Sequence, residues 1–298
     1  MKPAPLTLHI PRSPEEALDI IAAIGDIDEV KILAGGQSLV PVLALRLAQP
    51  MHLIDINGLG AEFAAVEHAD GVLRIGGLVR HRELERSAVV AQHCPLISEA
   101  VPQIAHPAIR NRGTIGGSLA HADPAAELPA VVLALDAQIR TVGPDGARTI
   151  PAGEFFQGFM TTALEPAEIL VGVDVPDLPP NSGTAFVEVS RRPGDFALVA
   201  AAAVVTVADG RIVGARLTLA GVGDRPIRME AAEAALRDVP ADVALVSQVA
   251  RSVTARLNPH ADGHAPSAYR RHVAGVVSAR ALLSAYERAV DGAERATD

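Results

Sequence analysis

The N-terminal part of the chain alternates apolar and polar residues in a pattern that predicts a small β-α-β-α-β unit. Ser13 is expected to cap a helix that starts at Pro14, with Glu16 closing a capping box, and Gly25 is expected to end it. The expected elements are strands at 6–10, 30–34 and 51–56 and helices at 14–24 and 42–47. A glycine loop follows the second strand, at the sheet edge where α/β proteins bind ligands.

The pattern in the middle part of the chain predicts a second set of elements that contains both strands and helices. The expected strands lie at 72–77, 138–142, 148–150 and 168–175, and the expected helices at 81–87, 95–105 and 125–135. Gly143–Gly146 is expected to turn a hairpin. Residues 106–124 are rich in Gly, Pro, Asn and His and are expected to be irregular. An irregular stretch of this length is more often functional than idle.

A proline-rich polar segment at 176–183 marks the expected domain boundary. Beyond it, strands are expected at 184–189, 197–207 and 211–219, the last two joined at Asp209–Gly210, and helices at 228–236, 241–257 and 268–290. The pattern predicts an α+β protein. Its first domain spans residues 1–176, with lobes of about 1–56 and 57–176, and its second spans 184–290, a three-stranded antiparallel sheet with a helical bundle.

Composition narrows the classes of function. The chain has 298 residues, 49% of them hydrophobic, and a formal net charge of −9, which favours a globular protein and argues against nucleic-acid binding. The longest apolar run, 196–205, is about half the ~20 residues of a membrane-spanning helix. Since Cys94 is the only cysteine, neither a disulfide nor a four-thiolate iron–sulfur cluster can form within the chain. The N-terminus lacks the apolar core of a secretion signal, so a cytoplasmic location is expected.

Two glycine pairs suggest an anion site. Gly35–Gly36 lies between a predicted strand and a predicted helix, and Gly116–Gly117 is flanked by the hydroxyls of Thr114 and Ser118. Glycine lets the backbone take positive φ and lets a ligand approach main-chain N–H groups, so two such loops suggest a diphosphate held from both sides. The alternative is a tight turn at each position. No P-loop and no Gly-x-Gly-x-x-Gly between a strand and a helix is present.

Four motifs resemble the FAD-binding medium subunit of molybdenum hydroxylases, the family of carbon monoxide dehydrogenase and xanthine dehydrogenase flavoproteins. They are Ala-Gly-Gly-Gln-Ser-Leu at 34–39, Thr-Ile-Gly-Gly-Ser at 114–118, Ala-Asp-Pro-Ala-Ala-Glu-Leu-Pro at 122–129, and Ser-Arg-Arg-Pro-Gly-Asp-Phe-Ala at 190–197. The resemblance covers nearly the whole chain.

The resemblance implies FAD between the two N-terminal lobes, with its pyrophosphate against the loops at 35–39 and 114–118. The implied cofactor-binding residues are Ala34, Gly35, Gly36, Gln37, Ser38, Leu39, Ile104, Thr114, Ile115, Gly116, Gly117, Ser118, Asp123, Glu127 and Phe196. Glu127 would bind the ribityl side of the flavin, Ile104 would lie near the flavin, and Phe196 would cover one ring face. The alternatives are an acidic residue in the first turn of a helix for Glu127, simple core for Ile104, and the start of a core strand for Phe196.

Other residues near these motifs have open roles. His106 and His121 flank the second glycine loop and could hydrogen-bond the cofactor or be solvated. Arg191 and Arg192 could grip an anionic partner surface or the cofactor, or be a solvated pair, and Gly76–Gly77 could approach a ligand or end a strand. Leu198 stands where some NAD-reducing relatives have lysine. No metal-ligand spacing is present, including around His260 and His264, and no residue is assigned a catalytic role.

The function that the resemblance implies is electron transfer within a larger enzyme. A large partner chain would hold the molybdenum cofactor, and a small partner chain with [2Fe-2S] clusters would feed electrons to this flavin, in a dimer of heterotrimers. The hydroxylated substrate and the electron acceptor (NAD, oxygen, quinone or cytochrome) stay open. Two alternatives are a free-standing FAD oxidoreductase and a non-catalytic scaffold that has lost its flavin.

Overall fold

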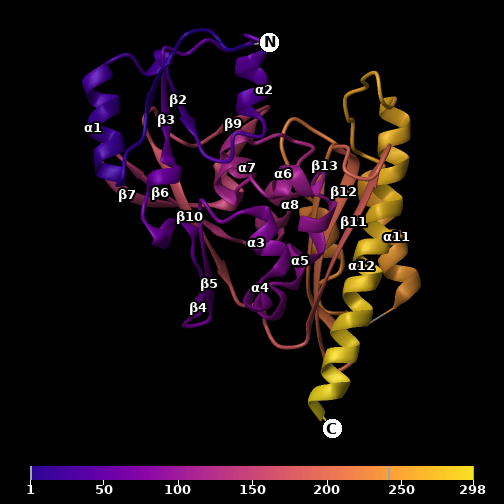
Figure 1. Ribbon diagram of the computed structural model, residues 1–298. Coiled ribbons are helices and arrows are strands. Elements are labelled where there is room, and N and C mark those ends of the chain that lie inside the picture. The colour runs from indigo at the N-terminus through magenta and orange to yellow at the C-terminus, as the bar shows by residue number, and fades with distance from the viewer. Residues whose placement is uncertain (1, 241, 298) are drawn as a thin grey trace.

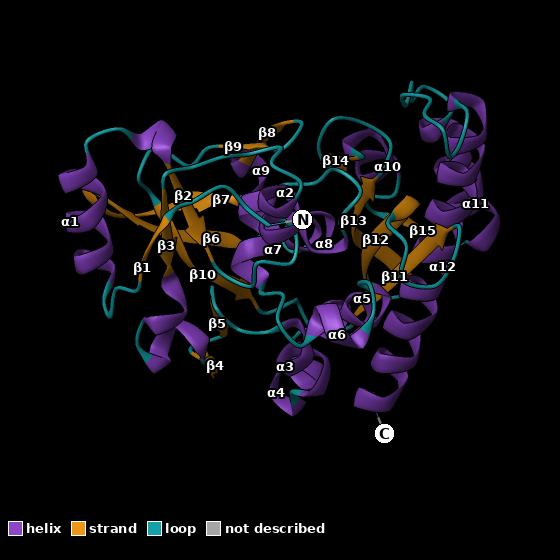
Figure 2. Ribbon diagram, turned by 45° about the horizontal axis from the view of Figure 1, so that its top comes forward, coloured by secondary structure: helices purple, strands orange, loops and turns teal. Residues whose placement is uncertain are grey.

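A computed structural model describes residues 2–240 and 242–297. Runs of helices and runs of strands follow one another along the chain, and most strands form three sheets that lie one after another along the molecule (Figures 1 and 2). A parallel sheet from the N-terminal part lies at one end, and the C-terminal sheet lies at the other, with the long helix α12 along it. In the described ranges, no helix is both long and apolar enough to cross a bilayer.

The N-terminal sheet is parallel, with strand order β1-β3-β2. Its elements are β1 (Thr7–His9), α1 (Pro14–Ile24), η1 (Ile27–Glu29), β2 (Val30–Leu33), α2 (Leu39–Ala44), β3 (His52–Asp55) and η2 (Ile56–Gly58). Ser13 caps α1 by accepting a hydrogen bond from the Glu16 N–H at 3.2 Å, and Gly25 ends the helix with φ +77°. Glu16 itself accepts from the Arg12 N–H and not from Ser13, so the predicted capping box is shifted by one residue.

The central sheet is antiparallel, with strand order β4-β5-β10-β6-β7. Its strands are β4 (Val66–Ala69), β5 (Val72–Gly76), β6 (Gln138–Gly143), β7 (Gly146–Pro151) and β10 (Ile169–Pro176). The elements between these strands are η3 (Ala61–Ala64), α3 (His81–Arg86), α4 (Ala88–His93), α5 (Pro95–Ala100), η4 (Val101–Gln103), α6 (Pro107–Arg110), α7 (Ile115–His121), α8 (Glu127–Ala134), α9 (Ala152–Phe155), β8 (Phe156–Gly158) and β9 (Thr161–Thr162). The hairpin predicted at Gly143–Gly146 is present.

The expectation that residues 106–124 are irregular is wrong. The stretch contains two short helices, α6 and α7, and Thr114 caps α7 by accepting from the Gly117 N–H at 3.1 Å. Gly116 lies inside α7, where a Cβ would sit 2.6 Å from the carbonyl oxygen of Gly77. Gly116 therefore serves close packing of a helix against the end of β5, a tertiary requirement that local propensity does not reveal.

The C-terminal sheet has more strands than the three expected. Its elements are β11 (Ser182–Ser190), β12 (Ala197–Ala208), β13 (Arg211–Ala220), β14 (Ile227–Arg228), α10 (Glu230–Ala235), β15 (Val239–Pro240), α11 (Val243–Thr254) and α12 (Ser267–Thr297). Within the described residues, β14 and β15 both pair with β13 and bring the sheet to five strands. They were missed because two-residue strands carry no periodicity. The predicted start of a helix at Ala241 lies outside the described residues.

Strand β12 is covered on both faces, which explains its long apolar sequence. Helix α12 packs against β11 and β12, and α8 packs against β12 and β13. Nearly every residue of β12 is buried. The turn Asp209–Gly210 joins β12 to β13 with φ +49° and +70°, as the sequence predicted for a two-residue hairpin.

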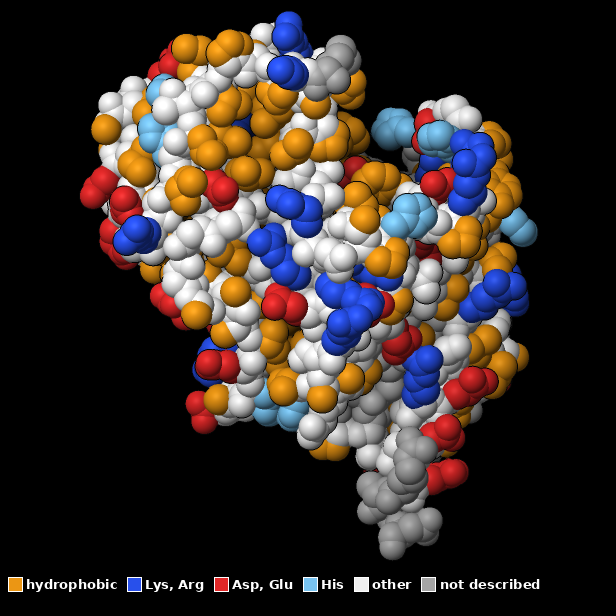
Figure 3. Space-filling view, in the orientation of Figure 1, with side chains coloured by type: hydrophobic (Ala, Val, Ile, Leu, Met, Phe, Trp, Pro, Cys, Tyr) orange, Lys and Arg blue, Asp and Glu red, His pale blue; other side chains and the backbone are white. Residues whose placement is uncertain are grey.

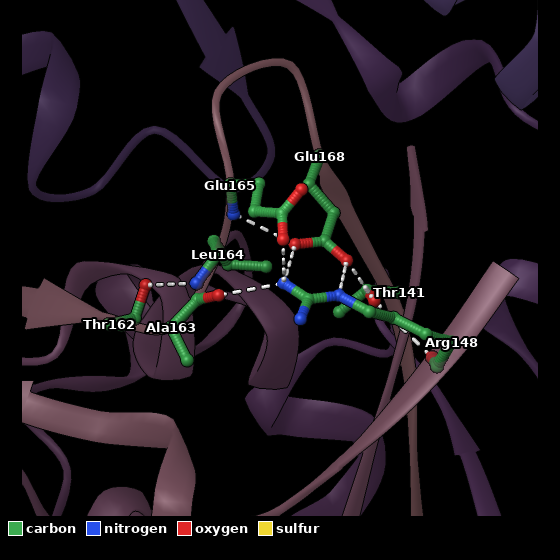
Figure 4. Close-up of polar contacts among 7 residues, drawn as sticks. All are labelled: Thr141, Arg148, Thr162, Ala163, Leu164, Glu165 and Glu168. Carbon is green, nitrogen blue, oxygen red and sulfur yellow. Dashed lines mark hydrogen bonds and ion pairs between the residues drawn. The ribbon is translucent and has the colours of Figure 1, made fainter. Parts of the chain in front are cut away.

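A buried carboxylate ties the β6–β7 hairpin to the turn before β10 (Figure 4). Glu168 accepts hydrogen bonds from the Arg148 guanidinium, at 2.6 Å for both Nε and Nη2, from the Thr141 hydroxyl, and from the Glu165 N–H at 2.8 Å. Burial opposes the charge, but these donors outweigh it and lower the pKa of Glu168 to about 2.

We expect Glu168→Gln to lower the free energy of unfolding by about 1–3 kcal/mol at neutral pH, because buried donors lose their charged acceptor. The pKa of Glu168 is lower in the folded state than the ordinary glutamate value of 4.5. The stabilisation is therefore complete above about pH 4.5, and the gap between wild type and variant narrows as the pH falls towards 2. Urea unfolding at several pH values measures both the loss of unfolding free energy in the variant and its dependence on pH.

The matched control is Glu165→Gln, because Glu165 is 63% exposed and lies 3.6 Å from Arg148. Its effect should stay below about 1 kcal/mol. Equal losses in the two variants would contradict the assigned role of Glu168.

Candidate functional site

A cavity of about 450 Å³ lies where three segments of the chain meet. The segments are the turn after β2 with the start of α2, the stretch from η4 to the start of α8, and the residues just before β12. In the space-filling view, the surface is hollowed at the top, between the part that carries α2 and the part that carries the loop before α12 (Figure 3).

The structure brings most of the predicted site residues to this cavity. Those that line it are Gly35, Gly36, Gln37, Ser38, Ile104, Thr114, Gly117, Ser118, Asp123, Glu127 and Phe196. Four predicted residues are not among the lining residues: Ala34, Leu39, Ile115 and Gly116. Gly77 does not line the cavity either, because its carbonyl accepts the Gly116 N–H at 2.9 Å. The structure therefore favours the alternative that Gly76–Gly77 ends a strand over the alternative that it approaches a ligand.

The turn after β2 presents unpaired main-chain donors. None of the N–H groups from Gly35 to Leu39 donates a hydrogen bond to another residue in the described ranges. Gly36 has φ +73°, a conformation that favours glycine and turns successive amides in one direction. Five consecutive free amides at the N-terminal end of α2 form a concavity suited to an anion.

The second predicted loop is built differently. The N–H groups of residues 115–118 have partners inside the protein: Ile115 donates to Val79, Gly116 to Gly77, Gly117 to the Thr114 hydroxyl oxygen and Ser118 to the Thr114 carbonyl. Gly116 and Gly117 lie in helical backbone rather than at positive φ. The expectation that free amides approach a ligand from both loops is therefore wrong for this loop, which offers hydroxyl groups and a closely packed wall.

A polar bridge holds the two segments together. Asn57 donates to the Ala34 carbonyl at 2.8 Å and accepts from Arg80 Nη2 at 2.6 Å, while Arg80 also donates to the Arg112 carbonyl. Gly35 packs directly on this second segment, since a Cβ there would lie 2.3 Å from the Arg112 oxygen. The bridge fixes the width of the cavity without filling it.

His81 is a cavity residue that the sequence did not reveal. It is the first residue of α3 and is only 6% exposed, and neither ring nitrogen has a hydrogen-bond partner within the described residues. Burial is the main cause that lowers the pKa of His81 to about 4, so the ring is neutral at pH 7. The Thr114 backbone acts against burial and raises the pKa of the ring, but burial outweighs it. A neutral imidazole has one donor and one acceptor.

Glu127 begins α8 and is 5% exposed. Burial, with nearby Glu188 and Asp123, raises the pKa of Glu127 to about 8. The carboxyl group is therefore mostly protonated at pH 7, and it can donate as well as accept. A neutral carboxyl gains little from the helix dipole, which weakens the alternative that Glu127 merely stabilises the helix N-terminus.

Phe196 separates the first cavity from a second one of about 740 Å³, and its side chain is 59% exposed. Asp123, Gly194 and Asp195 also line both cavities. Phe196 directly precedes β12, which fits the prediction that it starts a core strand. It also faces open space, which fits the prediction that it covers one face of a flavin ring. Ile104 likewise lines the first cavity while it belongs to the apolar core.

The residues with open roles occupy different positions around these cavities. His121 lines the first cavity, whereas His106 packs beneath the turn at Gly194, where a Cβ would lie 2.7 Å from the His106 ring. Arg191 lines the second cavity and hydrogen-bonds His264 at 2.8 Å, and Arg192 lines neither. Leu198 also lines the second cavity.

Comparison with known proteins identifies relatives over nearly the whole chain. The family described as FAD binding domain in molybdopterin dehydrogenase matches residues 4–178, and the CO dehydrogenase flavoprotein C-terminal domain family matches residues 184–285. The 6-hydroxypseudooxynicotine dehydrogenase complex subunit alpha of Paenarthrobacter nicotinovorans is 42% identical over 290 residues, covering 97% of each chain. The carbon monoxide dehydrogenase medium chain of Afipia carboxidovorans is 35% identical, covering 97% of this chain and 99% of that protein.

A solved structure is similar in fold throughout. It is carbon monoxide dehydrogenase from Hydrogenophaga pseudoflava lacking the Mo-pyranopterin moiety of the molybdenum cofactor. Its TM-score is 0.93 at 37% sequence identity, with 97% of this chain and 99% of that chain covered.

We expect Gly35→Ala to lower the free energy of unfolding by about 1–3 kcal/mol, because its Cβ would overlap the Arg112 carbonyl and force the two segments apart. The control is Gly153→Ala in α9, where a Cβ meets no atom within 4 Å. The control should leave the unfolding free energy unchanged or raise it by up to about 1 kcal/mol. A Gly35→Ala protein as stable as the control in urea unfolding would contradict the close packing of the two segments.

Proposed function

Since the chain belongs to the family of FAD-binding subunits of molybdenum hydroxylases, the carbon monoxide dehydrogenase and xanthine dehydrogenase flavoproteins, we propose that it holds FAD in the 450 Å³ cavity and relays electrons. The chain is a flavoprotein oxidoreductase subunit. In this role it would take electrons from iron–sulfur clusters of a partner and pass them to an external acceptor.

The free amides of Gly35–Leu39 are the observation that carries this proposal. A pyrophosphate brings negative charge and several acceptor oxygens, and consecutive main-chain N–H groups satisfy both without a lysine. No lysine lines the cavity. These N–H groups have no acceptor within the described residues, so a turn that keeps five of them fits an acceptor supplied by a ligand.

The remaining polar groups suit the uncharged parts of FAD. His81 and Glu127 are both neutral at pH 7, and each can donate and accept one hydrogen bond. Such groups match sugar or polyol hydroxyls and the edge of a heterocycle better than they match a phosphate. The thiol of Cys94, in contrast, is buried with its pKa raised to about 12, which leaves it outside the chemistry.

Bound FAD would supply a redox centre able to exchange electrons singly or in pairs, which links iron–sulfur clusters to two-electron acceptors. The chain itself would position the cofactor and exclude water. In this proposal residues 1–176 hold FAD, in lobes of about 1–56 and 57–176, and residues 184–290 bring Phe196 to the cavity mouth.

The partner chains follow from the family. The matching relatives are named as subunits or medium chains of dehydrogenases, so the proposal includes a large subunit with the molybdenum cofactor and a small one with [2Fe-2S] clusters. The single cysteine agrees with clusters held elsewhere. A dimer of these heterotrimers is the assembly that we propose.

The visible spectrum of the purified protein tests the cofactor. Oxidised-flavin bands with about one FAD per chain are expected, and a colourless, fully folded protein would favour the scaffold alternative. Co-purification with two other chains, one carrying iron and sulfur, separates the subunit from a free-standing FAD oxidoreductase, which would turn over an organic substrate alone.

Glu127 offers a sharper test of the site. We expect Glu127→Gln to retain FAD, with a dissociation constant within about threefold of wild type, because a neutral amide replaces a protonated carboxyl group of similar shape. Glu127→Ala should weaken FAD binding at least tenfold, which corresponds to about 1.4 kcal/mol. Equilibrium dialysis of the flavin at pH 7 measures both, and equal affinities for the two variants would contradict a direct contact.

A further inference from the structure

Three side chains from distant parts of the sequence converge beside the central sheet, far from the cavity of the proposed cofactor. They are His68 in β4, His93 at the C-terminal end of α4 and Asp177 just after β10. One ligand atom from each lies within 4.8 Å of the other two. Spacing along the sequence could not reveal this group, which is why the sequence predicted no metal site.

We propose that His68, His93 and Asp177 bind a borderline divalent metal ion, Zn²⁺ foremost. Two imidazoles and one carboxylate form a ligand set typical of zinc, with bonds of about 2.0–2.2 Å. In a tetrahedral site, such ligand atoms lie about 3.3–3.5 Å apart. From separations of at most 4.8 Å, the three atoms therefore need to approach one another by up to about 1.5 Å.

Two of the three residues already form a hydrogen bond that a metal can replace. His68 Nε2 lies 2.9 Å from Asp177 Oδ1 and 3.0 Å from Oδ2. A metal ion would take the place of the bridging proton, since both atoms present lone pairs once that proton leaves. All three side chains retain some solvent access, so an ion can enter.

The hydrogen bond between His68 and Asp177 does not account for the position of His93. Its ring stacks on His68 with centroids 3.5 Å apart and an interplanar angle of 15°, yet its nitrogens form no hydrogen bond to another residue of the described chain. The lone pair of an imidazole nitrogen lies in the plane of the ring, so stacked rings do not direct their lone pairs at one point. Coordination of both rings to one ion therefore requires the rings to turn until their nitrogens converge.

The site is open on one side. A cavity of about 440 Å³ is lined by both His93 and Asp177, which leaves a fourth position for water. Three protein ligands with one open position are compatible with zinc. Imidazole nitrogens disfavour the hard ions Mg²⁺ and Ca²⁺, which prefer oxygen ligands.

An ion at this site would hold the first residue of the connection between β10 and β11 in place. Asp177 begins that connection, and its N–H already donates to the Gly71 carbonyl at 2.8 Å. Coordination would also link this connection to α4 through His93 and to β4 through His68. The ion would thus stabilise the point where the chain leaves the central sheet for the C-terminal one.

The test is calorimetric titration of Zn²⁺ into the purified, untagged full chain after treatment with a chelator. We expect about one equivalent to bind saturably with a dissociation constant below about 10 μM. His68→Gln and His93→Gln should each weaken binding at least tenfold, as should Asp177→Asn. The matched control is His52→Gln, which removes a histidine of another His–His contact, 3.0 Å from His9 with no carboxylate beside it, and should leave zinc affinity unchanged.

Each outcome of the titrations either supports or overturns the metal site. Absence of saturable binding overturns the proposal, and so does binding that survives in His68→Gln or His93→Gln or that is lost equally in His52→Gln. Circular dichroism and the flavin content of each variant report whether it has folded. Asp177→Asn preserves the side chain's size, so it keeps the test valid if a histidine variant fails to fold. Mg²⁺ at the same concentration should give no comparable heat.

Discussion

The main-chain N–H groups from Gly35 to Leu39 have no acceptor within residues 2–240 and 242–297, and the packing around them fixes where they lie. A parallel sheet places this turn at its carboxyl edge, and Gly36 takes a positive φ there. Gly35 lies against the neighbouring segment so closely that a Cβ there would overlap the Arg112 carbonyl. The turn therefore keeps its position beside that segment while its N–H groups stay available to an acceptor from outside the chain.

The charge pattern of the cavity follows from the same constraint. In the proposed site, main-chain dipoles would supply the attraction for phosphate, so the walls need no lysine or arginine for it. Burial keeps His81 unprotonated and Glu127 protonated, and each is neutral at pH 7 for the same physical reason, the cost of desolvating a charge. A site of this kind distinguishes the charged part of a ligand from its uncharged part by position alone.

The sequence predicted well what depends on local patterns and poorly what depends on contact across the fold. The turn at Gly35–Gly36 was recognisable because a strand, a glycine pair and a helix follow in order. Helix α7 was missed because two glycines oppose helix formation locally, and the approach to Gly77 that explains Gly116 depends on contact across the fold. Asn57, Arg80 and His81 gave no signal, since their roles depend on partners more than twenty residues away or on burial.

Helix α8 explains how the C-terminal sheet comes to act on a cavity built mainly by the N-terminal part. Its residues are all buried, because β12 and β13 cover one side and α5 and α7 lie against it as well. The Thr218 hydroxyl donates to the Ala130 carbonyl at 2.6 Å, and the Gly221 N–H donates to Pro124 at 2.8 Å. Since Glu127 starts this helix and Phe196 immediately precedes β12, the two cavity residues are fixed to one packed unit. Movement of the C-terminal sheet would therefore displace both together, which would give a partner bound to that sheet a physical route to the cavity.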